Sequence, residues 1–325
     1  MHFDTFNGDF EELARLIDSV WGGHFGTKTH FRYPPDWLAG FFDGSGANRD
    51  LLIEHRDGSG AITGFIGAVP RRYRVHGREV RLGLVTLLTS SPRNVGFVGL
   101  EIERELFKRG AAADLFGTYH FCLDGQRTPD LLRWAAKSRK TTAIEVAPVS
   151  SLLRAAKASP EGANEAEVRP VVTDDVPLLA DLVEAAGRAL PIGRIFSAEE
   201  FQATLDQAPP KRTLVLLRDG RPIGVCVYAR RQLVGTEVFD VANVDLLVAP
   251  DSTPDEARRF GGAIASDAAA HGARYVIAPQ RVASIFPHVR EAGLRLAMRT
   301  LRVFIVPSGP EQTVEALSPH LLEVE

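Results

Sequence analysis

Two matching hairpins, far apart in the sequence, limit the folds open to this chain. One reads LLIEHRDGSGAITGFIGAV and turns at Asp57-Gly58; the other reads TLVLLRDGRPIGVCVYAR and turns at Asp219-Gly220. Further strand and helix patterns follow each hairpin in the same order and at nearly the same offset. This agreement indicates duplication of one unit that mixes strands and helices. The expected fold class is α/β, with two tandem units, each a mostly antiparallel twisted sheet flanked by helices.

The length of 325 residues suits two domains of ordinary size. Residues 159–167, SPEGANEAE, are small and polar, as in a linker. We therefore expect an N-terminal unit over residues 1–158 and a C-terminal unit over residues 168–325. Within them, we expect a break or bulge near Pro70 in a long strand, and a helix over Ser284–Ala292.

Composition argues against several classes of function. The net charge of −3 is unlike a nucleic-acid-binding surface, which needs concentrated positive charge. Cys122 and Cys226 are too few for a disulfide framework, and no His or Cys spacing predicts a metal site. The N-terminus lacks a signal-peptide core, and no apolar run approaches the ~20 residues of a membrane span. We expect a cytoplasmic protein without metal, nucleic-acid or membrane partners, and its oligomeric state stays open.

The segment Leu84–Gly110, LVTLLTSSPRNVGFVGLEIERELFKRG, predicts a buried strand, a basic glycine-bearing turn and an amphipathic helix. Unpaired backbone N–H groups at the start of a helix bind anions, and glycine lets a phosphate group approach them closely. The sequence therefore predicts a phosphate-binding turn between this strand and this helix.

The expected order in each unit is strand, two helices, a three-strand antiparallel meander, helix, strand, helix and strand. In this order, and in the glycine turn after the fourth strand, the chain resembles the GNAT acyltransferases. Their turn reads Q/R-x-x-G-x-G/A. Arg93 and Gly96 match its first two positions, whereas Val98 stands where glycine or alanine is expected and Gly99 follows one residue later. The resemblance covers nearly the whole chain as two tandem units, in a layout similar to N-myristoyltransferases and mycothiol synthases.

The resemblance implies a coenzyme A thioester as co-substrate, either acetyl-CoA or a longer acyl-CoA, bound in the first unit. An acyl carrier protein is the alternative donor. In this fold, a bulge in the fourth strand presents a backbone N–H that polarises the thioester carbonyl. The residues implied for cofactor binding are Leu87, Leu88, Thr89, Arg93, Asn94, Val95, Gly96, Phe97, Val98 and Gly99.

The resemblance also implies that the strand after this helix lies beside the reacting groups. Tyr119 and His120 are the titratable candidates there, the tyrosine as proton donor to the thiolate and the histidine as base for the amine. Adjacent strand residues face opposite ways, so at most one of them points into a given site. A buried structural role is the alternative for each.

The expected acceptor is the amine of a small molecule. The loop between the first two helices often borders the acceptor in this fold, which selects Trp21, His24, Phe25 and Tyr33; packing of that loop over the sheet is the alternative. Asp240 belongs to a polar run on a strand of the second unit. That run suits either a cationic amine or a solvated strand edge.

The second unit contains a formal match to the turn motif over Arg258–Ala263. However, Pro254-Asp255-Glu256 resembles the first turn of that helix, which would place Gly261 and Gly262 inside it. No free N–H groups remain at such positions. We therefore predict that these glycines serve close packing of helix on sheet, and that the donor site lies in the first unit.

The expected function is that of an acyl-CoA-dependent N-acyltransferase. It would move an acyl group from a thioester to a small-molecule amine by direct transfer in a ternary complex. Two alternatives stay open. One is a non-catalytic acyl-CoA-binding or scaffold protein. The other is an aminoacyl-tRNA-dependent transferase, since such enzymes also use tandem GNAT units, although the acidic charge balance argues against it.

Overall fold

The computed structural model describes most of the chain, and the described residues form two compact units. The described ranges are 2–26, 28–44, 48–75, 77–91, 97–123, 128–158, 167–188, 190, 192–206, 211–279 and 285–308. Of these, unit 1 contains 2–26, 33–148 and 301–308, and unit 2 contains 28–32 and 149–300. The expected linker at 159–167 lies outside the described residues except for Glu167.

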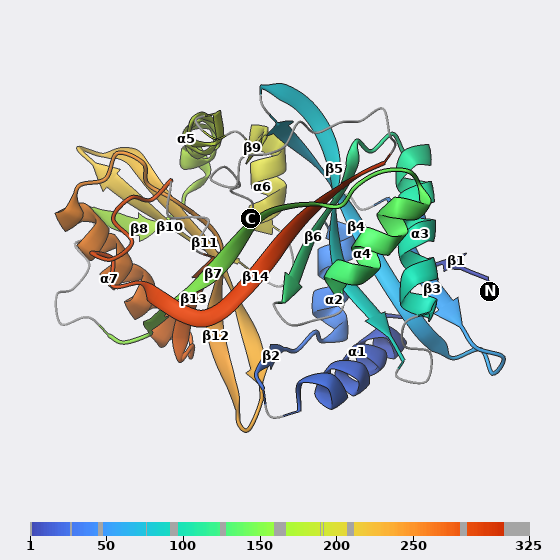
Figure 1. Ribbon diagram of the computed structural model, residues 1–325. Helices are drawn as coiled ribbons and strands as arrows, with labels where there is room; N and C mark the ends of the chain where they lie inside the picture. The colour runs from blue at the N-terminus through green and yellow to red at the C-terminus, as the bar shows by residue number, and fades with distance from the viewer. Residues whose placement is uncertain are drawn as a thin grey trace. The chain divides into compact units, whose positions relative to one another are not determined.

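Unit 1 is built on a sheet with the strand order β1-β3-β4-β5-β6-β14 (Figure 1). Neighbouring strands pair antiparallel, except β5 and β6, which run parallel. The strands are β1 (Asp4–Thr5), β3 (Leu52–Arg56), β4 (Ile62–Val75), β5 (Arg78–Ser90), β6 (Gly117–Leu123) and β14 (Arg295–Pro307), the last from Leu301 onward. A short 3-10 turn, η1 (Arg49–Leu51), leads into β3.

Helices cover both faces of this sheet. They are α1 (Phe10–Phe25), α2 (Pro35–Gly44), α3 (Phe97–Ala112) and α4 (Thr128–Ser138). Because side chains alternate along a strand, Ile66 of β4 packs in the layer under α3, whereas Phe65 contacts Phe42 of α2. The layer under α3 and α4 includes Leu106 and Leu132, both fully buried. The apolar spacing of each helix therefore matches the face that it covers.

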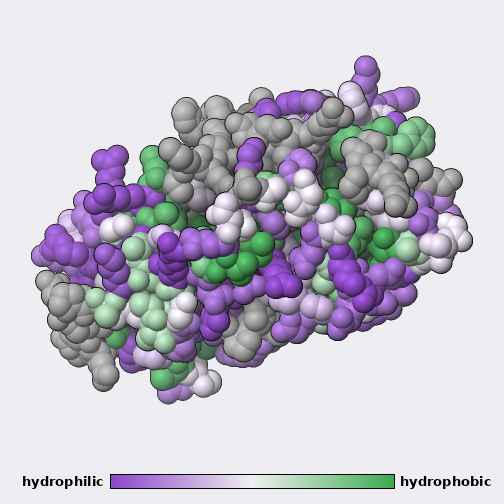
Figure 2. Space-filling view, turned by 90° about the horizontal axis from the view of Figure 1, so that it is seen from below, coloured by the Kyte–Doolittle hydropathy of each residue, from purple (hydrophilic) through white to green (hydrophobic). Residues whose placement is uncertain are grey.

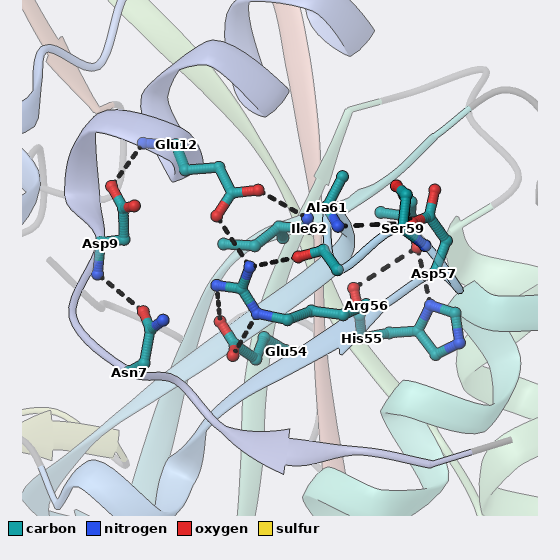
Figure 3. A network of polar contacts seen from close by, with 12 residues as sticks. Asn7, Asp9, Glu12, Glu54, His55, Arg56, Asp57, Ser59, Ala61 and Ile62 are labelled. Atoms are coloured by element: carbon teal, nitrogen blue, oxygen red, sulfur yellow. Dashed lines mark hydrogen bonds and ion pairs between the residues drawn. The ribbon is translucent and has the colours of Figure 1, made fainter.

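A polar network fixes the start of α1 to the hairpin of β3 and β4 (Figure 3). Asp9 caps the helix by accepting a hydrogen bond from the backbone N–H of Glu12 at 2.9 Å. Glu12 in turn accepts from the backbone N–H of Ile62 at 2.8 Å and from Arg56 at 2.9 Å. Arg56 also donates to Glu54 at 2.8 Å, and these carboxylates raise the pKa of Arg56 above its usual range. The network holds in place the helix that carries Trp21.

Unit 2 repeats the plan with the strand order β8-β10-β11-β12-β13-β7, in which β12 and β13 form the parallel pair. Its strands are β2 (His30–Phe31), β7 (Ile144–Ala155, from residue 149 onward), β8 (Val168–Pro170), β9 (Ile192–Arg194), β10 (Lys211–Arg218), β11 (Arg221–Val234), β12 (Val238–Val248) and β13 (Tyr275–Pro279). Its helical elements are η3 (Thr173–Asp175), α5 (Val176–Arg188), α6 (Ala198–Asp206) and α7 (Pro254–Ala270). The matching order confirms the predicted pair of tandem α/β units.

The strand interruption that we expected near Pro70 is absent. β4 runs unbroken from Ile62 to Val75, and Pro70 pairs with Gly83 of β5. The last pair between β3 and β4 joins Leu52 to Gly67. Pro70 lies beyond that pair, so its missing N–H removes no hydrogen bond to β3.

The predicted helix over Ser284–Ala292 is also absent from its described part, residues 285–292, which forms turns. Pro287 lies in the middle of this stretch, where it removes a backbone N–H that a helix would need. The apolar spacing of the segment still serves packing, because Phe286 and Ala292 are fully buried in the core of unit 2.

The hydropathy of the helices and of the surface can be compared with what a membrane span would need. Among the described helices, none has both the length and the apolar character that crossing a membrane would require. In the view of Figure 2, hydrophilic residues cover most of the described surface, and hydrophobic residues reach it in separate patches.

Candidate functional site

Strand β5 carries a β-bulge at Leu87 and Leu88. Gly67 of β4 pairs with Thr86, and Phe65 pairs with Thr89, so these two leucines together oppose Ile66. Leu87 has a φ of 60°, a left-handed conformation that is rare for a bulky side chain. A bulge removes residues from the regular ladder and redirects their backbone groups. The backbone at Leu87 and Leu88 is therefore available for a role other than sheet pairing with β4.

The described pairing between the parallel strands β5 and β6 ends just before the bulge. Their paired residues run from Leu82 with Gly117 to Val85 with His120. Beyond this last pair, β5 continues to Ser90 and β6 continues to Leu123. The facing edges of the two strands are therefore outside the described ladder there, and an extended group with amides of its own could pair with them.

Helix α3 begins at Phe97, immediately after the turn that we predicted to bind phosphate. Phe97 is 69% exposed, and the first turn of α3 contains no acidic residue. Gly99 lies beside Ser90 and Leu131, with room for a Cβ atom at ordinary contact distance. The positive end of the helix dipole is therefore not neutralised by a carboxylate of its own first turn. Four residues of the predicted site, Arg93, Asn94, Val95 and Gly96, lie outside the described residues.

The structure also places Val98 on the inner side of α3, where it is buried. A Cβ atom on Gly64 of β4 would come within 2.8 Å of the side chain of Val98. Glycine at position 64 thus allows the start of α3 to lie close over the sheet. Val98 packs on the sheet in this arrangement, and its side chain does not face solvent.

Three of the residues predicted for the acceptor, Trp21, Phe25 and Tyr33, come together beside the bulge. The indole N–H of Trp21 donates to the hydroxyl oxygen of Thr89 at 3.2 Å. The ring of Trp21 makes edge contacts with Phe25 and Tyr33, with centroids 5.8 Å and 5.3 Å away. His24 is exposed and contacts Phe25 with a centroid distance of 4.9 Å. This side of the bulge is therefore lined with aromatic rings.

Sequence reasoning missed the continuation of this aromatic row along α2. Trp37 lies 5.0 Å from Tyr33, and Phe41 is stacked 5.0 Å from Trp37, measured between ring centroids. Part of the signal was present in the sequence, because Trp37 and Phe41 are four positions apart in α2 and so share one face of the helix, which Tyr33 precedes.

Tyr119 and His120 face opposite sides of β6, as strand alternation requires. Tyr119 is fully buried, and its ring contacts Tyr73 and Phe121. His120 points toward α3, where its Nε2 lies 2.8 Å from the hydroxyl oxygen of Thr118. Burial lowers the pKa of His120 to about 3, so the imidazole is neutral and shielded from water.

Sequence reasoning also missed Glu103, a fully buried residue of α3 that faces His120. Its Oε1 lies 3.8 Å from Nδ1 of the histidine, and burial raises the pKa of Glu103 to about 8. Helical spacing could have revealed it, because positions 99, 103, 106 and 110 lie on one face and all are buried. A carboxyl group in such a stripe is unusual.

Asp240 lies in unit 2, on β12, where its carboxylate already has a partner. Its Oδ2 accepts from Arg230 at 2.7 Å, and its backbone carbonyl accepts from the N–H of Arg274 at 2.8 Å. The negative charge of Asp240 is therefore compensated within unit 2, so a cationic acceptor would have to compete with Arg230.

The N-terminus of α7 is the counterpart of the N-terminus of α3. Residues at the start of α7 itself cap its backbone N–H groups, and we call such a helix terminus closed. Thr253 caps the helix, and Glu256 accepts from the backbone N–H of Thr253 at 2.7 Å. Glu256 also accepts from Nε of Arg218 at 2.7 Å, a hydrogen bond that lowers the pKa of the carboxylate to about 2. Gly261 and Gly262 lie inside this helix, as predicted. The structure thus confirms that the second motif is not a strand-to-helix turn.

Among the described residues, no three His, Cys, Asp or Glu side chains are grouped so that they could hold a metal ion. No protein-family model matches the sequence, and no curated protein matches it. Solved structures do match. N-myristoyltransferase of Saccharomyces cerevisiae with bound myristoyl-CoA has a TM-score of 0.74 at 12% identity, over 94% of this chain and 82% of that chain.

Two further matches are bacterial proteins. A GCN5-related N-acetyltransferase from Anabaena variabilis has a TM-score of 0.60 at 11% identity, over 97% of this chain and 75% of that chain. Another from Kribbella flavida has a TM-score of 0.53 at 14% identity, over 94% and 70%. At such low identities, the likeness establishes the fold. The chain has the GNAT fold in its tandem form, as in N-myristoyltransferase.

Proposed function

We propose that the chain is an acyl-CoA-dependent N-acyltransferase, which moves an acyl group from a thioester to the amine of a small molecule. The observation that carries this proposal is the bulge at Leu87 and Leu88, followed along the chain by the open N-terminus of α3. A backbone N–H outside the ladder can stabilise the oxyanion of acyl transfer, and a helix N-terminus binds phosphate. The similar N-myristoyltransferase structure holds myristoyl-CoA, which supports a CoA thioester as donor.

In this proposal each part of the donor has a place in unit 1. The pyrophosphate binds at the turn before α3, where Phe97 and Gly99 belong to the first helical turn. The pantetheine amides pair with the facing edges of β5 and β6 beyond Val85 and His120. The thioester carbonyl then reaches the bulge. The donor is acetyl-CoA or a longer acyl-CoA, with an acylated carrier protein as the alternative.

The acceptor approaches from the side of the bulge that Trp21, Phe25 and Tyr33 line. Aromatic faces attract a protonated amine and pack against its carbon skeleton. Acceptor and donor meet at the bulge in a ternary complex, where the neutral form of the amine attacks the thioester carbonyl. The C–N bond forms as the C–S bond breaks, the nitrogen loses a proton to water, and the leaving thiolate gains one. Tyr119 faces away from α3 and is the proposed proton donor to the thiolate. His120 is a poor base at neutral pH, because burial lowers its pKa to about 3.

Isothermal titration of the full chain with acetyl-CoA, longer acyl-CoAs and free CoA tests the proposal. We expect binding of at least one acyl-CoA, and release of free CoA thiol when an amine from a small-molecule panel is added. A folded protein that binds none of these compounds would contradict the proposal.

A second candidate is a non-catalytic acyl-CoA-binding protein. It is favoured by the burial of Tyr119 and His120, the titratable side chains that we expected to carry protons. Both functions predict that acyl-CoA binds in the calorimetric titration, but only the enzyme should release CoA thiol when an amine is added. Acyl-CoA binding without thiol release, across amines that include amino acids and polyamines, would support the binding protein over the enzyme.

A further inference from the structure

Helix α3 buries a carboxyl group that no hydrogen bond compensates among the described residues. The side chain of Glu103 is 0% exposed, and neither of its oxygens has a hydrogen-bond partner there. Its neighbours on this face of the helix, Ile102, Leu106 and Phe107, are buried and apolar. Placing a carboxyl group in such surroundings costs free energy that an apolar side chain would not. Structural packing alone therefore gives no reason for glutamate at this position.

His120 is the polar group that faces this carboxyl group. Its Nδ1 lies 3.8 Å from Oε1 of Glu103, which is within ion-pair distance and longer than a hydrogen bond. The other ring nitrogen is 2.8 Å from the hydroxyl oxygen of Thr118, and the ring stands edge-on to Phe107. Burial raises the pKa of Glu103 to about 8 and lowers that of His120 to about 3. At neutral pH the carboxyl group therefore holds the proton.

The pair lies between two parts of the proposed donor site. Among the described residues, His120 is the last of β6 that pairs with β5, and its partner Val85 lies two positions before Leu87 of the bulge. Glu103 lies one helical turn after Gly99, in the helix whose N-terminus faces the phosphate-binding turn. The contact between Glu103 and His120 thus links that helix to the end of the described ladder between β5 and β6.

Unit 2 shows that the fold does not require a polar pair at this contact. The α7 residues in the core of unit 2 include Phe260, Ala263 and Ile264, all apolar. On β13, Val276 and Ala278 belong to the same core. Val276 pairs with Ala242 of β12, as His120 pairs with Val85 of β5. The same contact of helix with strand is therefore packed with apolar side chains in the unit whose helix N-terminus is closed.

We propose that Glu103 and His120 are positioning residues for the donor. Together they set the spacing between α3 and β6 at the point where the described pairing of β5 and β6 ends, and they do so while the pair retains its proton. The inference rests on the proposed function, because it concerns the same donor site. Neither residue touches the donor in this proposal; both act through the positions of the helix and the strand.

Loss of the proton would leave a negative charge buried between α3 and β6. The groups around the pair do not compensate it. Cys122, the next residue on that face of β6, is a buried thiol whose pKa burial raises to about 12. Arg302 and Arg133 are the cations whose charge acts to lower the pKa of that thiol, and both are paired with Glu145. The charge would draw water into the contact or separate the helix from the strand. Donor affinity should therefore fall as the pH rises through the titration of Glu103.

The first test measures the affinity of the full chain for acetyl-CoA by isothermal titration. Glu103→Leu removes the proton carrier and keeps an apolar side chain in the contact. We expect it to fold and to bind acetyl-CoA roughly tenfold more weakly, because the site is slightly displaced. Glu103→Gln keeps a neutral hydrogen-bonding group and should bind within about threefold of the wild type. A leucine variant that folds and binds like the wild type would overturn the inference.

Glu101→Gln is the matched control for these variants. It removes a carboxylate of the same helix that pairs with Arg104 and is 28% exposed, so it does not face β6 in the core. We expect no change in acetyl-CoA affinity for this variant. An equal loss of affinity in Glu101→Gln and Glu103→Leu would mean that substitutions on α3 weaken binding whether or not they touch the buried pair, which also overturns the inference.

The pH profile is a second readout, which holds even where the leucine variant fails to fold. Affinity for acetyl-CoA is measured from about pH 6 to about pH 9 for the wild type and for Glu103→Gln. The wild type should weaken toward the alkaline end, and the glutamine variant, which has no proton to lose, should not. Parallel profiles in the two proteins would overturn the inference. Absence of acyl-CoA binding by the folded wild type would instead overturn the proposed function, and this inference with it.

Discussion

The N-termini of α3 and α7 occupy corresponding places in two units of the same strand order, and they differ in what closes them. At α7, Thr253 caps the helix, and Glu256 accepts hydrogen bonds from Thr253 and Arg218. At α3, the first turn has no acidic residue, and its first side chain, Phe97, stands exposed. A carboxylate within the first turn satisfies the free N–H groups and the helix dipole, so an external anion gains little there. One fold can therefore present or lack a carboxylate in the first turn of this helix through a few residues.

The glycines of the two helices differ in the same way. Gly261 lies inside α7, where a Cβ atom would come within 2.3 Å of the backbone oxygen of Ala292. Gly99 of α3 would place a Cβ atom 3.5 Å from Leu131, an ordinary contact. The glycine of the second unit is thus required for close packing of the helix. The glycine of the first unit is not required by packing, because an alanine Cβ atom would fit there at ordinary contact distance.

The largest expected effect comes from adding one methyl group to each glycine. Gly261→Ala should lower the free energy of unfolding by roughly 3 kcal/mol, because the new carbon overlaps the backbone at Ala292. Gly99→Ala should leave stability unchanged or raise it by up to about 1 kcal/mol, through its higher helix propensity. Urea denaturation of both variants measures this. Equal destabilisation by the two substitutions would contradict the claim that packing requires glycine at position 261 and not at position 99.

The next prediction converts the open helix terminus into a closed one. Phe97→Glu places a carboxylate in the first turn of α3, which should reduce affinity for acyl-CoA roughly 10- to 100-fold while preserving stability. Phe97→Gln, of similar size and without charge, is the control for loss of the aromatic ring. Titration calorimetry gives the affinities. If the glutamate and glutamine variants bind equally well, the phosphates bind elsewhere.

The buried pair in unit 1 should make the stability of the protein depend on pH. The pKa of Glu103 rises from 4.5 to about 8 on folding, so the folded state holds more protons between these values and loses stability as the pH rises. The pKa of His120 falls from 6.5 to about 3, which gives the opposite slope between those values. The slopes cancel between 4.5 and 6.5. The net result is a loss of about 2 kcal/mol from about pH 6.5 to about pH 8.

Denaturation at several pH values measures this loss, and Glu103→Leu should abolish it. Ile264→Val in α7 is the matched control from the apolar layer of unit 2. It should lower stability by about 1 kcal/mol at every pH and leave the slope unchanged. A leucine variant with the wild-type slope would show that Glu103 does not titrate with a raised pKa.

The smallest expected effect is at the cap of α7. Thr253→Ala removes the hydroxyl that accepts from the N–H of Glu256, and should lower the free energy of unfolding by about 1 kcal/mol. Affinity for acyl-CoA should not change, because the cap lies in the unit with the closed helix terminus. A change in affinity without a matching change in stability would show that unit 2 takes part in donor binding.

Local patterns in the sequence predicted much of this architecture. The repeated hairpin indicated two α/β units, and the structure has them. Pro254 and Glu256 predicted the start of α7 and hence the burial of Gly261. These predictions succeed because capping and turn formation depend on residues within a few positions of one another.

The predictions that failed depended on more distant partners. The apolar spacing over Ser284–Ala292 suits a helix, but Pro287 and the surrounding core produce buried turns in the described part. The sequence also does not specify which sheet each half's last strand joins. Residues of β14 from Leu301 pair with β6, and Ser151 to Ala155 of β7 pair with β13. Short apolar strands of alternating pattern fit either edge, so long-range packing selects the partner.

The sequence by itself determined the repeated α/β unit, the strand and the helix that flank the proposed phosphate site, and the capped N-terminus of α7. Only the tertiary structure brought Trp21 to Thr89, gave Leu87 its left-handed backbone at the bulge, and enclosed Glu103 opposite His120. The reason is physical. Periodicity and caps are fixed by neighbours in the chain, whereas burial and the pKa shifts that follow from it arise from segments that meet only when the sheet has formed.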